Sequence, residues 1–228
     1  MAELDRRTLL NASLAAGAAA AAAPVLAQKP AAGFAPKPLP FDPASVPGLS
    51  PKLLTSHHDN NYAGAVKRLG AIQGEWGKLD PATAPGFQIN GLKREELIAW
   101  NSMILHEIYF AGLGAPTRPG AALSAALERD FGSHDRWRAE FIGMGKALGG
   151  GSGWVLLTWS DHDGRLTNQW AADHTMTLAG STPLLALDMY EHAYAMDYGA
   201  KAGDYVEAYM KAIRWDEADR RFAKASRA

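Results

Sequence analysis

Cysteine is absent from this sequence of 228 residues. Disulfides, thiolate nucleophiles and cysteine-type zinc or iron–sulfur sites are therefore excluded, which leaves histidine and carboxylate as the strong metal ligands. A surplus of either charge is also lacking, because 23 basic and 24 acidic residues give a net charge of −1. A nearly neutral chain favours neither a nucleic acid nor an acidic membrane surface as its partner.

The first 27 residues have the pattern of an export signal. Arg6 and Arg7 precede an alanine-rich apolar run that ends at Ala27, and paired arginines in this position are typical of the bacterial twin-arginine signal. An uncleaved membrane anchor is the alternative. We expect a signal at 1–27, a Pro- and Ala-rich extended lead-in at 28–47, and a periplasmic or secreted mature protein with no membrane attachment after cleavage.

The pattern of predicted secondary structure in the remaining chain changes near residue 118, from helices alone to helices and strands. Apolar residues at helical spacing predict helices at 50–69 and 93–112, with a loop at 70–90 between them, and shorter helices at 120–130 and 133–148. The apolar stretch at 154–159, the turn at 161–164 and the segment 165–172 then predict a β-hairpin at 154–172. A third short strand is expected at 184–187 and a closing helix at 205–224.

We therefore expect the α+β fold class, in which an N-terminal long-helix hairpin is followed by a three-stranded antiparallel sheet with helices. The domain boundaries that we predict are 48–118 for the helical hairpin and 119–228 for the α+β metal-binding domain.

Three segments carry candidate metal ligands. In the stretch LDMYEHAYAMDYG, Asp188 and His192 are four residues apart, and His57 and His106 lie among apolar residues of predicted helices. Taken singly, each helical histidine is more often a hydrogen-bonded core residue than a ligand. Taken together, three imidazoles and one carboxylate suit iron, manganese or zinc. Spacing alone leaves both interpretations open.

The stretch from Asp188 to Tyr194, Asp-Met-Tyr-Glu-His-Ala-Tyr, resembles the C-terminal signature of iron/manganese superoxide dismutases, Asp-x-Trp-Glu-His-Ala-Tyr. Further similarities occur in the family's order, at Leu39-Pro40-Phe41, His57-His58, Gly151-Ser-Gly-Trp154 and Thr182-Pro-Leu-Leu185. The chain is thereby identified as a member of this family.

The resemblance implies a function and a set of site residues. The function is conversion of superoxide to O₂ and H₂O₂ by one Fe or Mn ion per chain, in a homodimer or a higher homo-oligomer. Trp154 would wall the metal pocket, Glu191 would reach His192 of the partner chain, and Tyr194 would stand near the dimer's entrance to the site. The implied ligands are His57, His106, Asp188 and His192.

The sequence also departs from the family. Asn61 and Ala65 stand where the family has a gateway His and Tyr. His174 is expected to hydrogen-bond the metal-bound solvent, and an exposed strand-end histidine is the alternative. The family's Arg-Pro pair is Ala202-Gly203 here, which removes a cation unless Lys201 replaces it. The altered gateway favours one alternative function, that of a mononuclear Fe/Mn protein acting on peroxide or a small organic substrate. A non-catalytic dimeric metal-binding protein is a further alternative.

Overall fold

The computed structural model describes residues 34–227. The predicted signal at 1–27 and the start of the predicted lead-in lie outside the described residues. The rest of the lead-in follows the body of the protein, because Phe34, Leu39 and Phe41 pack against the hydrophobic core. Within residues 34–227, no helix is both long and apolar enough to cross a membrane.

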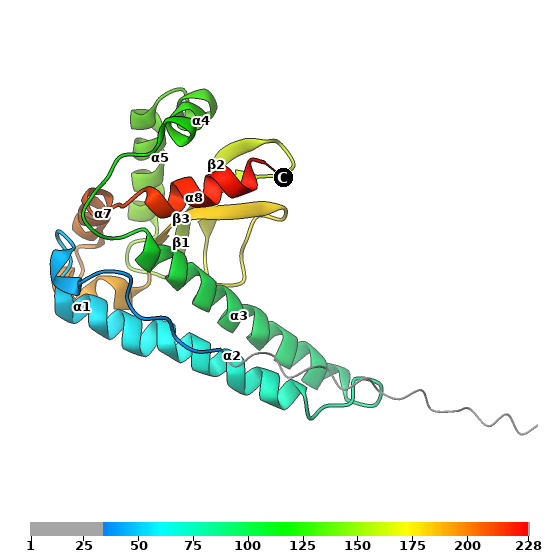
Figure 1. The fold of residues 1–228 in the computed structure, drawn as a ribbon. Coiled ribbons are helices and arrows are strands. Elements are labelled where there is room, and N and C mark those ends of the chain that lie inside the picture. The colour runs from blue at the N-terminus through cyan, green and yellow to red at the C-terminus, as the bar shows by residue number, and fades with distance from the viewer. Residues whose placement is uncertain (1–33, 228) are drawn as a thin grey trace, which may run out of the picture.

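The N-terminal part is a hairpin of two long helical segments that lie side by side (Figure 1). The first segment starts where Ser50 accepts a hydrogen bond from the Leu53 amide at 3.1 Å and Pro51 occupies the first turn. The elements are η1 (Pro43–Ser45), α1 (Pro51–Ser56), the π-helix η2 (His57–Tyr62), α2 (Ala63–Trp76) and α3 (Gly86–Ala111).

The predicted loop at 70–90 was too long. Helix α2 continues to Trp76 and α3 already begins at Gly86, so that only a short connection remains. Gly70 and Gly74 lower the helix propensity of α2. Packing of Val66, Leu69 and Ile72 against the core outweighs that cost.

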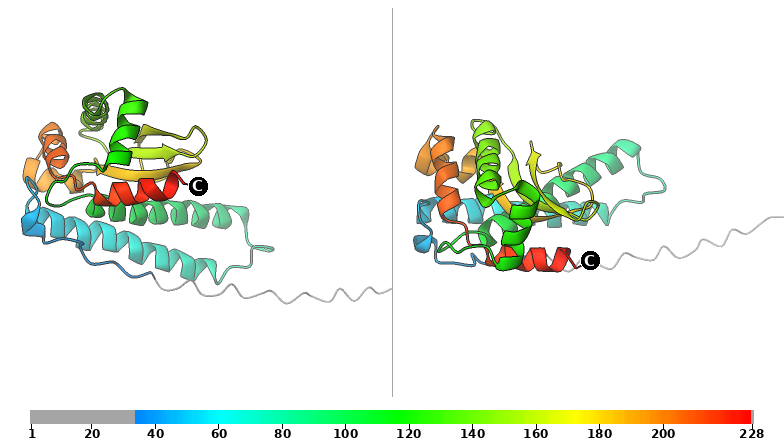
Figure 2. Two further views of the ribbon diagram at one scale, coloured as in Figure 1. Left: turned by 45° about the horizontal axis from the view of Figure 1, so that its top comes forward. Right: turned by 90° about the horizontal axis from the view of Figure 1, so that it is seen from above.

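The C-terminal part is a three-stranded antiparallel sheet with helices on both faces, which confirms the α+β fold class. Figure 2 shows α3 and α8 along one face of the sheet and α4 and α5 over the other. The elements are α4 (Ala121–Phe131), α5 (His134–Ala147), β1 (Trp154–Ser160), β2 (Arg165–Ala171), β3 (Ser181–Asp188), η3 (Glu191–Ala193), α6 (Ala195–Tyr198), α7 (Ala202–Lys211) and α8 (Asp216–Ala225).

The predicted closing helix is two helices in the structure. The chain leaves α7 after Lys211, and Ile213 forms an isolated β-bridge with Leu113 before α8 begins. That bridge ties the C-terminal part to the end of α3.

The centre of the sheet determines where the functional residues lie. Strand β1 is buried at every position, as expected for a middle strand that is covered on both faces. Its register with β3 places Trp154 opposite Asp188. Gly153, just before β1, has φ +129, and a Cβ atom there would lie 2.2 Å from the Ala171 carbonyl oxygen. Only glycine fits where the backbone of residue 153 comes this close to the backbone of β2.

Candidate metal centre

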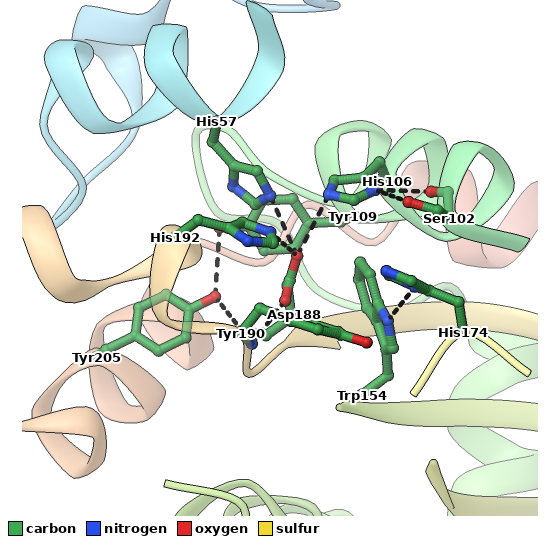
Figure 3. A network of polar contacts seen from close by, with 10 residues as sticks. All are labelled: His57, Ser102, His106, Tyr109, Trp154, His174, Asp188, Tyr190, His192 and Tyr205. Carbon is green, nitrogen blue, oxygen red and sulfur yellow. Dashed lines mark hydrogen bonds and ion pairs between the residues drawn. The ribbon is translucent and has the colours of Figure 1, made fainter. Parts of the chain in front are cut away.

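The structure brings four predicted residues together from four separate segments. His57 begins η2, His106 lies in α3, Asp188 ends β3 and His192 lies in η3. One potential ligand atom from each side chain lies within 4.8 Å of all the others. Figure 3 shows the three imidazole rings surrounding the Asp188 carboxylate. The first three residues are fully buried, whereas the His192 side chain is 27% exposed.

The distances within this group suit a metal ion. The Nε2 atoms of His57, His106 and His192 lie 3.1, 3.5 and 3.3 Å from Asp188 Oδ2. Ligand atoms that are each about 2.0–2.1 Å from one ion, at angles of about 90–120°, are separated by roughly 2.9–3.6 Å. The three imidazoles and the carboxylate can therefore contact a single ion with little rearrangement.

Hydrogen bonds orient two members of the group. His106 Nδ1 donates to the Ser102 carbonyl oxygen at 2.6 Å, so the Nε2 atom of a neutral ring carries the lone pair. That Nε2 atom is buried and has no hydrogen-bond partner in the described structure. Asp188 Oδ1 accepts from the Tyr190 amide at 2.9 Å, which turns Oδ2 toward the histidines. A buried nitrogen without a partner is costly unless an ion or another polar group meets it.

The electrostatics favour a cation. Burial lowers the pKa of His57 and lowers that of His106 to about 3, so both rings are neutral at neutral pH. Burial alone raises the pKa of Asp188, but hydrogen bonds with His192 and His57 outweigh it and keep this pKa well below its usual range. The group thus presents one buried negative charge and lone pairs on neutral rings, which is the donor set of an Fe, Mn or Zn site.

The helix that carries His57 changes type at that residue. From His57 to Tyr62 the chain is a π-helix, in which hydrogen bonds skip one residue further than in an α-helix. Asn60 Nδ2 donates to the Ser56 carbonyl oxygen at 2.9 Å. This hydrogen bond gives a partner to the last carbonyl before the α-helix becomes a π-helix. Such single π-turns are frequent at functional sites. Helical spacing in the sequence did not reveal it.

Trp154 and His174 form one unit beside His106. Trp154 is fully buried, and its ring stands edge-on to His106 with centroids 5.2 Å apart. Its Nε1 donates to His174 Nδ1 at 3.0 Å (Figure 3). Because Nδ1 accepts this bond, Nε2 carries the proton of a neutral His174 ring. The Asn101 side chain donates to the His174 carbonyl oxygen at 2.6 Å and anchors that loop.

The Tyr190 ring lies between the rings of His174 and His192 and keeps them apart. It stacks on His174 at 4.8 Å and on His192 at 5.3 Å between centroids. Burial raises the pKa of Tyr190 to about 12, so the phenol is protonated at neutral pH. The sequence comparison had only marked this residue as a Tyr in the position of the family's Trp.

The altered gateway residues line an entrance cavity. Asn61, Ala65, Ser102 and His174 surround a space of about 220 Å³. Two of these lining residues contact the surroundings of the metal group: Ser102 is hydrogen-bonded to His106, and His174 is hydrogen-bonded to Trp154. The cavity therefore directly adjoins the metal group. Its cation is Arg68, which pairs with Glu95. Lys201, the residue that would have to replace the family's cation, is exposed just before α7 and does not line this cavity.

Glu191 and Tyr194, the two predicted interface residues, differ in solvent exposure within the single chain. Glu191 is exposed beside the metal group, which leaves it accessible to a second chain. Tyr194 is 2% exposed, its ring stacks on Tyr205, and its hydroxyl accepts from the Gly150 amide at 3.3 Å. Within the single chain the Tyr194 side chain is therefore part of the core, and its expected place near the dimer's entrance to the site stays a prediction.

Comparisons with known proteins agree with this geometry. Residues 119–221 match the family model of the iron/manganese superoxide dismutase C-terminal domain. The iron superoxide dismutase of Cupriavidus metallidurans is 65% identical over 84% of this chain and 97% of its own length. Manganese superoxide dismutase 1 of Halobacterium salinarum is 33% identical over 83% and 94%. The Mn/Fe superoxide dismutase of Propionibacterium freudenreichii is 32% identical over 82% and 95%.

Proposed function

Because this chain belongs to the iron/manganese superoxide dismutase family, we propose that it converts superoxide to O₂ and H₂O₂ at the candidate metal centre. His57, His106, Asp188 and His192 would hold one iron or manganese ion. The observation that carries the proposal is the convergence of three imidazole Nε2 atoms on the buried Asp188 Oδ2 atom. Iron is the metal to test first, since the 65% identical relative is named for it.

The residues of this chain have distinct tasks in that reaction. The metal, when bound, supplies the one-electron exchange with superoxide in two oxidation states. Asp188 contributes the negative charge that balances the ion, and Ser102 keeps the Nε2 atom of His106 directed at the centre. Trp154 excludes water from one side. Trp154 also fixes the ring of His174, whose Nε2 proton is then available to a water or substrate molecule in the entrance cavity.

A second copy of the chain would complete the site. His192 is the one member of the group with an exposed side chain, and the exposed Glu191 adjoins it. In a homodimer, Glu191 would accept a hydrogen bond from the partner's His192 and orient that ring. Sedimentation of wild type and Glu191→Ala tests this proposal, because the variant should dissociate at a higher protein concentration.

We also propose export of the mature protein to the periplasm or beyond the cell. The support is the paired arginines and the apolar run before Ala27. Fractionation with N-terminal sequencing tests it: a mature chain that begins near Gln28 supports cleavage, whereas retention of residue 1 contradicts it.

The decisive experiment is superoxide decay after pulse radiolysis, with protein loaded separately with Fe and Mn and normalised to bound metal. A dismutase accelerates the decay far beyond free metal, and Asp188→Ala abolishes the acceleration. Fully loaded protein without acceleration would contradict dismutase activity and leave two functions, a non-catalytic metal-binding protein or a mononuclear Fe/Mn protein with another substrate.

A second candidate function is supported by the size of the entrance cavity. The small side chains of Asn61 and Ala65 leave about 220 Å³ there, which is room for several water molecules or a small organic molecule. A mononuclear Fe/Mn protein acting on peroxides or phenols would use this space. Ala65→Tyr should then suppress turnover of a phenol while leaving superoxide decay intact. Equal effects on both substrates would count against the second function.

A further inference from the structure

A second cavity, which we call the rear cavity, lies behind the metal centre. Its volume is about 230 Å³, and it is lined by segments that are far apart in the sequence. The lead-in contributes Lys37, η2 contributes Tyr62, α3 contributes Phe110 and α8 contributes Arg221. The Tyr62 hydroxyl accepts from the Lys37 amide at 2.9 Å, which holds the lead-in over the helices. The rear cavity is thus a product of the tertiary fold.

One aromatic ring in the lining of this cavity, that of Phe110, also contacts the metal centre. The Phe110 ring centroid is 5.1 Å from that of His57 and 6.4 Å from that of His106. Asn61 and Tyr62 are adjacent in sequence, but Asn61 lines the entrance cavity whereas Tyr62 lines the rear cavity. The two cavities therefore approach the metal centre from different sides of η2.

Charged side chains give the lining of the rear cavity a net positive charge. Lys37, Arg220 and Arg221 face two carboxylates, Glu107 and Glu217. Lys37 pairs with Glu107, and both arginines bind Glu217, with Arg221 Nε at 2.7 Å. Three cations against two carboxylates leave one positive charge without a partner within this group. A guanidinium has five N–H donors, so both arginines can bind a further anion.

The remaining lining is largely apolar, and its apolar members are Pro38, Pro40, Phe110 and Ala111. A site with an apolar wall and a few convergent polar groups is typical of small-molecule binding. Its volume lies below the roughly 300 Å³ at which sites for drug-sized ligands begin. The ligand should therefore be a compact anion with one charge and an apolar body.

We propose that the rear cavity binds a small monocarboxylate with a compact apolar body. The carboxylate accepts hydrogen bonds from Lys37 and Arg221, and the apolar body lies against Phe110 and the two prolines. A molecule bound in the rear cavity would contact the Phe110 ring, which in turn contacts His57 and His106. This ring therefore connects the rear cavity to the metal centre.

Benzoate and its neutral analogue benzyl alcohol test the proposal by ligand-observed NMR titration of the mature protein. Benzoate should bind at least about 10-fold more tightly, because charge-assisted hydrogen bonds to Lys37 and Arg221 hold only the anion. Arg221→Gln should weaken benzoate about 10-fold and leave benzyl alcohol unchanged. Lys224→Gln is the matched control, since it removes a cation from the same helix but not from this cavity.

Two cavity-filling variants locate the bound molecule. Ala111→Leu should remove the binding of both probes, whereas Ala65→Tyr, which fills the entrance cavity, should leave benzoate affinity unchanged. Equal affinity for the two probes, or benzoate binding that survives both Arg221→Gln and Ala111→Leu, would overturn the proposal. None of these measurements needs catalytic turnover, so their outcome is independent of the superoxide experiment.

Discussion

The metal centre and the entrance cavity beside it are built in opposite ways. At the centre, His57, His106 and Asp188 are at most 1% exposed, and each is held by contacts from another segment. At the entrance, Asn61 and Ala65 leave about 220 Å³ of space. The space around two glycines shows the same contrast between the centre and the entrance. A Cβ atom at Gly153 would overlap the Ala171 carbonyl, whereas one at Gly64 would meet nothing within 4 Å.

This difference shows which features the fold constrains. A ligand side chain at the centre cannot move without leaving buried polar atoms unpaired, which costs about 1–3 kcal/mol per group. A side chain at the entrance can change size without disturbing the core. The chain can therefore retain the metal group while its gateway differs from that of the family it resembles. The following changes test the contrast.

The largest effect is expected for Asp188→Asn, which keeps the shape of the side chain but removes the charge that balances the ion. Metal affinity should fall by more than about 100-fold, since altering even an outer partner of a ligand costs about 10–100-fold. Metal content after dialysis and the metal-induced rise in Tm measure it. Asp163→Asn, in the exposed turn after β1, is the control. Retained metal binding in Asp188→Asn would contradict the assignment of this residue.

Gly153→Ala should be the most damaging small substitution near the centre. Its φ of +129 disfavours any side chain, and the new Cβ would lie 2.2 Å from backbone oxygen. We expect a loss of roughly 3 kcal/mol or more in the free energy of unfolding, measured by urea denaturation. Because Trp154 follows directly, its fluorescence should also change. A loss below about 1 kcal/mol would mean that the start of β1 is less constrained than its contacts indicate.

Acid should destabilise the metal-free protein through the buried histidines. Histidine titrates near 6.5 when unfolded, whereas burial lowers the pKa of His106 to about 3. Between these values the unfolded chain binds a proton that the folded chain does not, so stability falls as the pH falls. Each such histidine contributes a slope of up to about 1.4 kcal/mol per pH unit. Asp188, whose pKa is also lowered, adds a further loss below its unfolded value of 3.8.

Urea denaturation from about pH 7 to about pH 4 measures this slope. His106→Gln removes one titrating ring and should flatten the slope by up to about 1.4 kcal/mol per pH unit. His162→Gln is the control, because that ring lies in the exposed turn, where the hydrogen bond with Asp163 raises its pKa, so its loss should not flatten the slope. An unchanged slope in His106→Gln would show that burial of this ring does not control acid stability.

The smallest effect is expected for Gly64→Ala at the entrance. The position is exposed, helical and without neighbours within 4 Å. Alanine loses less backbone entropy than glycine in a helix, so stability should rise by about 0.5–1 kcal/mol. Thermal denaturation measures the gain. A loss of stability would show that the entrance is packed as tightly as the centre, and the contrast between the two regions would fail.

Local patterns in the sequence predicted much of the fold. The apolar run before the turn at Gly164 located β1 and β2, and the predicted ends of α4 and α5 lie within about one residue of the observed ones, whereas α3 begins at Gly86 and not at Lys93. Patterns failed where tertiary contacts outweigh propensity: α2 runs through Gly70 and Gly74, and the last helix divides at the bridge between Leu113 and Ile213.

The candidate site was predicted in its members but not in its arrangement. The motif at Asp188 and His192, together with two histidines on helices, identified the residues that the structure brings together. No spacing along the chain could show that Trp154 donates to His174, or that Arg68 rather than Lys201 supplies the entrance cation. The motif likewise specified a Tyr at position 194 but not that the Tyr194 ring is buried against Tyr205.

The amino-acid sequence by itself determined the chemistry of this protein: nitrogen and oxygen ligands only, two helical histidines, one Asp-to-His pair and a gateway with small side chains. Those properties belong to residue types and local order. Tertiary structure alone decided that three Nε2 atoms meet one carboxylate oxygen, which nitrogen of His106 and of His174 carries the proton, and where two cavities approach the centre. Distance, burial and tautomer depend on neighbours that are far apart in the chain, and only packing brings those neighbours into contact.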